Sequence, residues 1–127
     1  MSEPRRSGYA DRPDYDVHFE PFSGRVRVVF ADLTIANSTR VMRMHETKHQ
    51  PVFYFLRADV AIARLRPTTH QSFCPFKGEA SYWSVKVDDR EAENAVWSYE
   101  TPFPEVAEIR DYLAFYDDRV YAVLVEK

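Results

Sequence analysis

The stretch HQSFCPFKGEASYW at positions 70–83 contains the chain's only cysteine, a glycine and four aromatic side chains, and it decides how the rest of the sequence is interpreted. Pro75 favours an extended backbone at the preceding Cys74. Gly78 permits a left-handed turn or the close approach of another backbone segment. The stretch therefore predicts a strand, a tight corner and a second strand. Lys77 at the corner places a cation near the Cys74 sulfur, which favours the reactive thiolate.

Composition limits the class of protein. The chain has 127 residues, of which 45% are hydrophobic and 15% aromatic, so we expect one folded domain with one core. The formal net charge of -3 leaves no basic excess for phosphate groups, so neither nucleic acid nor an anionic membrane is expected as a partner. A single cysteine cannot form an internal disulfide, and the sequence shows no signal peptide, lipidation motif or long apolar run. We therefore expect a cytoplasmic protein.

The N-terminal region differs in composition from the remainder. Residues 1–16 are rich in Pro, Arg and Asp and lack apolar periodicity, which predicts a mobile arm before a single β-rich domain at 17–127. Tyr9 and Tyr15 are candidates for docking onto that domain.

Alternation of apolar and polar residues predicts a series of strands beyond the central stretch. The expected strands are 17–22, 25–30, 33–36, 39–44, 52–56, 82–87, 91–99 and 119–125, with the apolar pattern of 52–56 continuing to Leu65. For 39–44 a short helix capped by Ser38 is the alternative. Asp88 and Asp89 form a two-residue hairpin turn. Prolines at its entry, an acidic first turn and apolar spacing predict one short helix at 105–112. The fold class is therefore mainly β, a single small antiparallel domain.

The sequence HETKH at 45–49 matches the metalloprotease pattern H-E-x-x-H. That pattern binds zinc only on a helix, where both imidazoles share one face, and it needs a third ligand further along the chain. Pro51 follows closely, and no downstream helix offers that ligand. We therefore interpret His45 and His49 as exposed loop residues and expect no metal site.

Several longer blocks occur together in order. They are HETKHQPVFYF at 45–55 with ADV at 58–60, SFCPFKGEASYWSV at 72–85, AENAVWSYETPFPEV at 92–106, and YLAFY at 112–116 followed by DRV at 118–120. From about Val26 to Tyr121 the chain resembles the bacterial and fungal family catalogued as domain of unknown function 427. The resemblance is specific because these unusual blocks keep their order and spacing.

The resemblance implies a small, strongly curved β structure similar to the β-tent architecture of zinc-binding relatives. This sequence lacks the paired CxxC ligands of those relatives, so neither a metal nor another cofactor is expected. The family is sometimes labelled nucleotidyltransferase-like, and nucleotidyl transfer needs a phosphate cradle and acidic residues that hold magnesium. With three glycines and no Gly-rich loop, the composition argues against that activity.

The same blocks contain polar residues set among aromatic ones, which is the usual composition of a small-molecule pocket. The catalytic candidates are Glu46, Cys74 and Lys77, and the ligand-binding candidates are Tyr54, Asp59, His70, Tyr82, Trp97 and Tyr99. An aromatic-rich β core has the same composition, because buried Tyr and Trp need hydrogen-bond partners for structural reasons alone. Both interpretations stay open at this point.

Individual candidates also have two interpretations. Cys74 is a nucleophile or an inert buried hydrophobe. His70 is a loop histidine or the base for Cys74, although four extended residues separate them too far for contact without a turn. Tyr82, Trp97 and Tyr99 lie on two arms of a hairpin, where aromatic pairs stabilise a sheet by about 0.2–1 kcal/mol each.

Glu46 stands beside the apolar run at 52–55. Desolvation there would raise its pKa toward neutrality and suit it to acid or base catalysis. The alternative is a salt bridge to Arg57, Arg64 or Lys77.

Two functions follow from these candidates. The first is a β domain that binds a small molecule in an aromatic-lined pocket, either as a binding protein or as an enzyme. The second is a non-catalytic module that self-associates, as a homodimer, through a sheet edge or an aromatic face.

Overall fold

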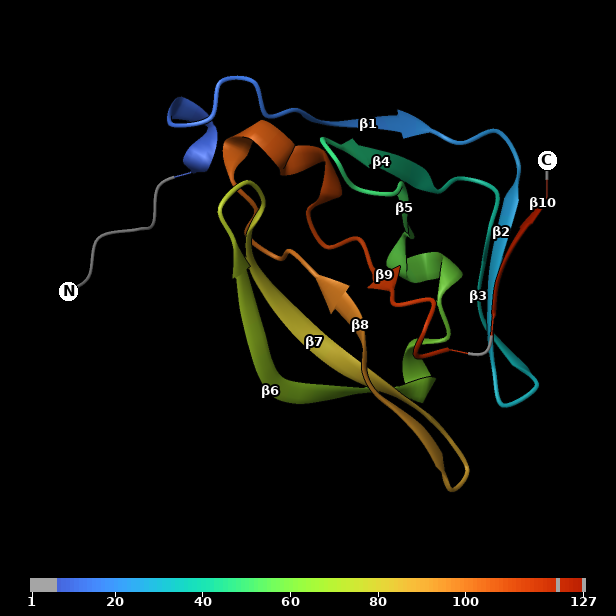
Figure 1. The fold of residues 1–127 in the computed structure, drawn as a ribbon. Coiled ribbons are helices and arrows are strands. Elements are labelled where there is room, and N and C mark those ends of the chain that lie inside the picture. Colours follow the sequence, from blue (N-terminus) through green and yellow to red (C-terminus); the bar gives the residue numbers. More distant parts are fainter. Residues whose placement is uncertain (1–6, 121, 127) are drawn as a thin grey trace.

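Three antiparallel sheets make up the structure, a computed structural model that describes residues 7–120 and 122–126. The strands are β1 (Val17–Pro21), β2 (Arg25–Phe30), β3 (Leu33–Ser38), β4 (Met42–Glu46), β5 (Val52–Tyr54), β6 (Leu65–Cys74), β7 (Gly78–Val87), β8 (Arg90–Ser98), β9 (Ala114–Phe115) and β10 (Ala122–Glu126). They are ordered β1-β4-β5, β10-β2-β3 and β6-β7-β8-β9. In Figure 1 the sheet with β1 lies at the top, the sheet with β2 at the right, and the long strands β6, β7 and β8 at the lower left. The mainly β fold class is confirmed; the likeness to a β-tent stays a prediction.

The hairpin of β2 and β3 shows how alternation shapes these sheets. Val26 and Val28 on β2 are fully buried, whereas the intervening Arg27 is only half-buried. The two turn residues, Ala31 and Asp32, have φ values of 51° and 64°, the positive values that tight hairpin turns require. The hairpin expected from the sequence is thereby confirmed.

The central stretch folds as a strand, a corner and a strand, as predicted. Cys74 on β6 pairs with Gly78 on β7, and Gly78 has a φ of 114°. A Cβ atom at this position would lie 3.4 Å from the carbonyl oxygen of Thr101, so the glycine also permits a close approach. The backbone N–H of Phe103 donates to the carbonyl of Lys77 at 3.1 Å. The corner is therefore fixed against the segment that follows β8.

The hairpin of β7 and β8 turns at Asp88 and Asp89, as predicted. The flanking Val87 and Arg90 pair with each other, and Asp88 has a φ of 55°.

The HETKH segment does not form a helix. Its first two residues end β4, which confirms the predicted strand, and the chain then turns at Lys48 with a φ of 64°. His45 Nε2 lies 2.7 Å from Glu20, whereas His49 Nε2 lies 3.8 Å from Glu46. The helical context of the zinc motif is therefore missing. Within residues 7–120 and 122–126, no group of three or more His, Cys, Asp or Glu side chains could hold a metal ion.

In the residues that the structure describes, helical structure is limited to short 3-10 helices. They are η1 (Gly8–Ala10), η2 (Arg57–Asp59), η3 (Ile62–Arg64) and η4 (Pro104–Ile109). The helix predicted at 105–112 corresponds to η4, which ends earlier, at Ile109, and has a kink within it at Val106, where φ is -128° and ψ is 30°. The continuation of the apolar strand to Leu65 is wrong, since η2 and η3 occupy that segment and Ile62 is exposed. No helix in the described part of the chain has the length and apolar character needed to cross a membrane.

Apolar side chains form two core clusters between the sheets. The first joins the sheet of β2 to β7 and β8, with Val28 and Val85 among its members. The second lies among β4, β5, β7 and η4, with Met44, Tyr82 and Ile109 among its members. Each cluster takes residues from more than one sheet, so the sheets depend on one another for burial.

The arm packs on the corner of β6 and β7 over the residues that the structure describes. The Tyr9 hydroxyl donates to the carbonyl of Phe76 at 2.8 Å, and the Tyr15 ring stacks on the Phe76 ring at 3.7 Å between centroids. Both tyrosines thus dock on the body. Residues 1–6 lie outside the described residues, and the division of the chain at 16 stays a prediction.

Replacing Gly78 with alanine should lower the free energy of unfolding by about 1–3 kcal/mol, the usual cost of a side chain in such a backbone conformation. Urea denaturation measures the change. Glu79→Ala, at an exposed neighbouring position, is the control and should stay within about 0.5 kcal/mol of the parent. Equal stability of Gly78→Ala and the parent would show that the corner is not constrained.

Candidate functional site

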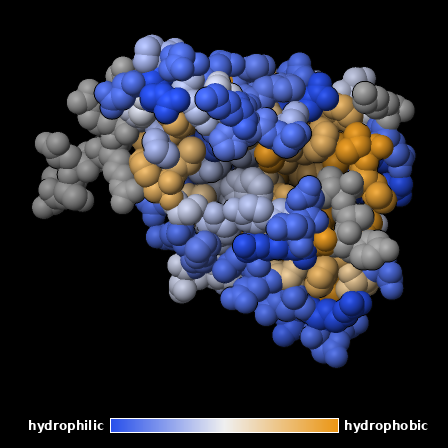
Figure 2. All heavy atoms as spheres, viewed as in Figure 1, coloured by the Kyte–Doolittle hydropathy of each residue, from blue (hydrophilic) through white to orange (hydrophobic). Residues whose placement is uncertain are grey.

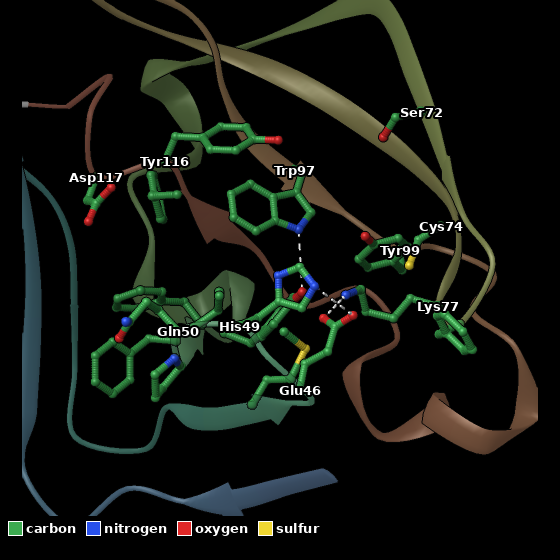
Figure 3. Close-up of a pocket in the computed structure, with 18 of the residues that line it drawn as sticks. Glu46, His49, Gln50, Ser72, Cys74, Lys77, Trp97, Tyr99, Tyr116 and Asp117 are labelled. Atoms are coloured by element: carbon green, nitrogen blue, oxygen red, sulfur yellow. Dashed lines mark hydrogen bonds and ion pairs between the residues drawn. The ribbon is translucent and has the colours of Figure 1, made fainter. Parts of the chain in front are cut away.

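A pocket of about 860 Å³ opens between the two core clusters, where β4, β5, the corner of β6 and β7, and β8 meet (Figure 3). Most of the predicted site residues line it, although they come from distant parts of the sequence. They are Glu46, Tyr54, Cys74, Lys77, Tyr82, Trp97 and Tyr99.

Asp59 and His70 do not line the pocket. Asp59 on η2 accepts hydrogen bonds from Ser38 Oγ at 2.6 Å and from Arg40 Nη2 at 2.9 Å, and the bond from Arg40 is the main reason that its pKa is lowered. It ties η2 to the end of β3. His70 is exposed on β6, with its ring 4.4 Å from that of Tyr82. Because β6 is extended between His70 and Cys74, the structure does not bring this pair together.

A buried ion pair forms the most polar part of the pocket. Lys77 Nζ donates a hydrogen bond to Glu46 Oε1, and the two side chains are only 9% and 5% exposed. The Tyr15 hydroxyl donates to the other carboxylate oxygen of Glu46, and His49 lies 3.8 Å from that oxygen. Figure 3 shows Lys77 and His49 pointing toward Glu46 from different elements. The salt-bridge interpretation of Glu46 is therefore the one the structure supports, with Lys77 as the partner.

The electrostatics of Glu46 differ from the sequence expectation. Burial raises the pKa of its carboxyl, but the hydrogen bonds from Lys77 and Tyr15 outweigh burial, and the net pKa is lowered. Of the two interpretations left open for Glu46, titration near neutrality is therefore the one that the structure does not support, because these two donors favour the charged carboxylate. Burial, together with the bond to Glu46, raises the pKa of Tyr15, so its hydroxyl remains a donor.

Aromatic rings form the wall next to this pair. The Trp97 indole N–H donates to the Tyr54 hydroxyl at 3.4 Å, and the Trp97 and Tyr116 rings lie 4.4 Å apart between centroids. Tyr54 is fully buried, and burial raises its pKa, so its hydroxyl stays neutral as the acceptor of this bond. Trp97 and Tyr116 are only half-buried and can contact a ligand.

Hydroxyl groups form a second polar region. Ser72 Oγ lies 2.8 Å from the Tyr82 hydroxyl, which lies 3.3 Å from the Tyr116 hydroxyl. Burial and the hydrogen bond with Tyr82 raise the pKa of Tyr116 to about 12, so the Tyr116 hydroxyl is a neutral donor and acceptor at physiological pH.

Cys74 ends β6 beside this wall. It is half-buried, lines the pocket and packs against the second core cluster. Its position suits either a reactive thiol or a small apolar contact, and both interpretations stay open.

Some lining residues were not selected from the sequence. Tyr15 lies in the arm, and nothing in its sequence context indicates Glu46 as its partner. His49 was correctly expected to be exposed, but the turn after β4 brings it back toward Glu46. Tyr116 lies in the YLAFY block, and the aromatic composition of that block is the sequence feature that could have indicated a place in the pocket.

Removing the carboxylate alone should strongly destabilise the fold. Glu46→Gln leaves the buried ammonium of Lys77 without a counter-charge, and we expect a loss of about 3–5 kcal/mol in the free energy of unfolding. The double variant Glu46→Leu with Lys77→Met should recover most of it, because apolar groups can replace a buried pair at little cost. Urea denaturation at neutral pH measures both. Glu20→Gln, which breaks a more exposed pair with Arg43, is the control and should lower the free energy of unfolding far less than Glu46→Gln does.

The free energy of unfolding of the parent, compared with that of the double variant, should also depend on pH. The folded-state pKa of Glu46 lies below the usual 4.5, so the contribution of its carboxylate is complete above that pH and is lost as the pH falls through the folded-state value. The stability of the parent relative to the double variant should therefore decrease in acid. Two results would contradict a stabilising ion pair. One is a difference in stability between the parent and the double variant that is the same at neutral and acidic pH, and the other is a Glu46→Gln protein as stable as the parent.

Comparison with known proteins identifies the family. The family described as "Domain of unknown function (DUF427)" matches residues 18–126, which contain all the blocks on which the resemblance rests. No curated protein matches the chain. Since the match covers most of the sequence, the chain belongs to the family of the domain of unknown function DUF427.

Proposed function

We propose that the protein binds a small, planar and largely uncharged molecule in this pocket. The observation that carries the proposal is a pocket of about 860 Å³ in which half-buried aromatic rings adjoin a buried ion pair. Ligand pockets usually have volumes of about 300–1,000 Å³ and combine apolar walls with a few polar groups. The proposed reactive groups are Glu46, Cys74 and Lys77, and the proposed walls are Tyr54, Tyr82, Trp97 and Tyr99.

The aromatic wall supports a planar ligand. Trp97 and Tyr116 are in contact with each other and remain half-buried, so their outer surfaces can pack against a flat apolar group. Stacked or edge-on aromatic contacts add about 0.5–1.5 kcal/mol beyond the apolar area that they bury.

The balance of charge supports an uncharged ligand. Lys77 and Glu46 neutralise each other, so the interior of the pocket offers no net charge, and Asp117 is exposed. An ammonium has three N–H donors, and the bond to Glu46 uses one of them. A carbonyl oxygen on the ligand would therefore find a donor at Lys77, and the hydroxyl groups of Tyr82 and Tyr116 would bind a second polar group.

A pocket ligand should raise the melting temperature of the parent, because a ligand at a hundred times its dissociation constant adds about 2.7 kcal/mol to stability. The measurement is a thermal-shift screen of planar aromatic and heteroaromatic compounds. Trp97→Leu should abolish the shift produced by a hit. His70→Ala, on an exposed residue outside the pocket, should keep it.

The single cysteine provides a second readout of the same binding. Since Cys74 lines the pocket, a bound ligand should slow its alkylation by iodoacetamide in proportion to occupancy. Hits that stabilise the protein while Cys74 alkylation stays unchanged would place the ligand elsewhere. A complete absence of hits would contradict the proposed function.

Self-association is the second candidate function. Strand β10 is at the end of its sheet, and its Leu124 and Val125 are 42% and 45% exposed. Figure 2 shows hydrophobic surface on the side of the molecule where β10 lies. An edge strand with exposed apolar side chains can pair with a second copy of the chain.

If β10 forms a homodimer, sedimentation velocity should show a dimer whose fraction rises with protein concentration, and Leu124→Lys should return it to a monomer. Ile62→Lys, at another exposed apolar position on η3, is the matched control. A parent that sediments as a monomer at every concentration would eliminate this candidate.

A further inference from the structure

Lys77 holds its amine at a fixed point in the pocket wall. Its backbone N–H donates to the carbonyl of Cys74 at 3.2 Å, and its own carbonyl accepts a bond from Phe103 at 3.1 Å. The side chain is only 9% exposed, and Nζ lies 6.0 Å from the centre of the Tyr99 ring. An ordinary surface lysine samples many rotamers, whereas this amine has a single environment.

A base lies in direct contact with that amine. An ammonium is not a nucleophile, so Lys77 must lose a proton before it can attack a carbonyl carbon. Glu46 Oε1 already accepts a hydrogen bond from Nζ, and Tyr15 holds the other carboxylate oxygen in place. Transfer of the proton to Glu46 converts the ion pair into a neutral amine and a neutral acid. The hydrogen bonds from Lys77 and Tyr15 that lower the pKa of Glu46 favour the ion pair, so the neutral amine is the minor and reactive form.

We propose that Lys77 forms an imine with a planar aldehyde or ketone bound in the pocket; this inference rests on the proposed function and specifies its ligand class. The amine nitrogen attacks the carbonyl carbon after its proton moves to Glu46, and a second N–H proton passes to the carbonyl oxygen to give a carbinolamine. The carbon–oxygen bond then breaks as Glu46 returns its proton to the leaving hydroxyl, and water leaves. The overall change is RCHO plus the lysine ammonium giving the protonated imine plus water, which requires no further reactant.

The charge of the product fits the same surroundings. A protonated imine carries the single positive charge that the ammonium carried, so Glu46 remains its counter-ion and the buried pair is preserved. The Tyr99 ring near Nζ offers a cation–π contact to this charge. The aromatic wall at Trp97 and Tyr116 suits the conjugated plane of an aromatic aldehyde.

Reductive trapping tests the proposal directly. The parent is incubated at neutral pH with benzaldehyde, cinnamaldehyde or naphthaldehyde and sodium cyanoborohydride, and adducts are located by intact mass and peptide mapping. Lys77 should be labelled at least about tenfold faster than the exposed Lys48 and Lys86, because binding holds the carbonyl beside the amine. Glu46→Gln should slow the labelling of Lys77, and Lys77→Arg should remove that adduct. Lys86→Arg is the matched control and should leave the adduct at Lys77 unchanged.

Because Glu46→Gln is expected to lower stability, a second measurement uses the parent alone. A non-carbonyl ligand from the thermal-shift screen should block labelling of Lys77 and leave that of Lys48 unchanged. Labelling of Lys77 no faster than that of Lys48 and Lys86 would overturn the imine. If planar ligands still stabilise the protein in that case, the proposed function stands without covalent chemistry; if none does, both proposals fail.

Discussion

The ion pair between Glu46 and Lys77 is the interaction on which the site depends. It joins residues 31 positions apart in the sequence, at the end of β4 and at the corner of β6 and β7. These elements belong to different sheets, so the pair fixes the position of one sheet relative to another across the pocket. Tyr15 extends this connection to the N-terminal arm by donating to the same carboxylate.

A buried ion pair is a costly way to join two sheets. The desolvation of two charges offsets most of their attraction, and apolar residues of similar volume often stabilise a fold equally well. The pair therefore contributes position and chemistry more than net stability. It supplies a donor, an acceptor and an amine at one point in a lining that is rich in aromatic and aliphatic side chains, and the hydroxyls of Ser72, Tyr82 and Tyr116 supply a second polar region. A ligand with polar groups at two places would bind in one orientation.

Much of the fold could be predicted from local signals. Alternation located most of the strands but not the short β9, and short-range turn chemistry located the hairpin at Asp88 and the corner at Gly78, because a two-fold period and a positive φ are local properties. The kink in η4 could not be predicted, since the backbone at Val106 is set by burial against the second core cluster. The exposed Ile62 was wrongly assigned to a strand because its apolar character alone suggested burial.

The candidate site was predictable in composition but not in geometry. The aromatic blocks indicated which residues gather, yet the partner of Glu46 had three alternatives in the sequence, and only the tertiary structure selects Lys77. The same limit explains Asp59, whose bonds to Ser38 and Arg40 tie it to β3 and away from the pocket. Long-range pairs of this kind depend on how the sheets pack against one another, and a local sequence pattern does not determine that packing.

The most direct test of ligand binding in this pocket uses the two tryptophans of the chain. In a ¹⁵N-labelled protein each indole N–H gives its own resonance: Trp97 lines the pocket, whereas Trp83 packs against the first core cluster with Arg57 over its ring. Titration with planar carbonyl compounds should shift the Trp97 indole resonance progressively and leave that of Trp83 in place. A library in which no compound moves Trp97, or in which ligands move Trp83 alone, would contradict the account.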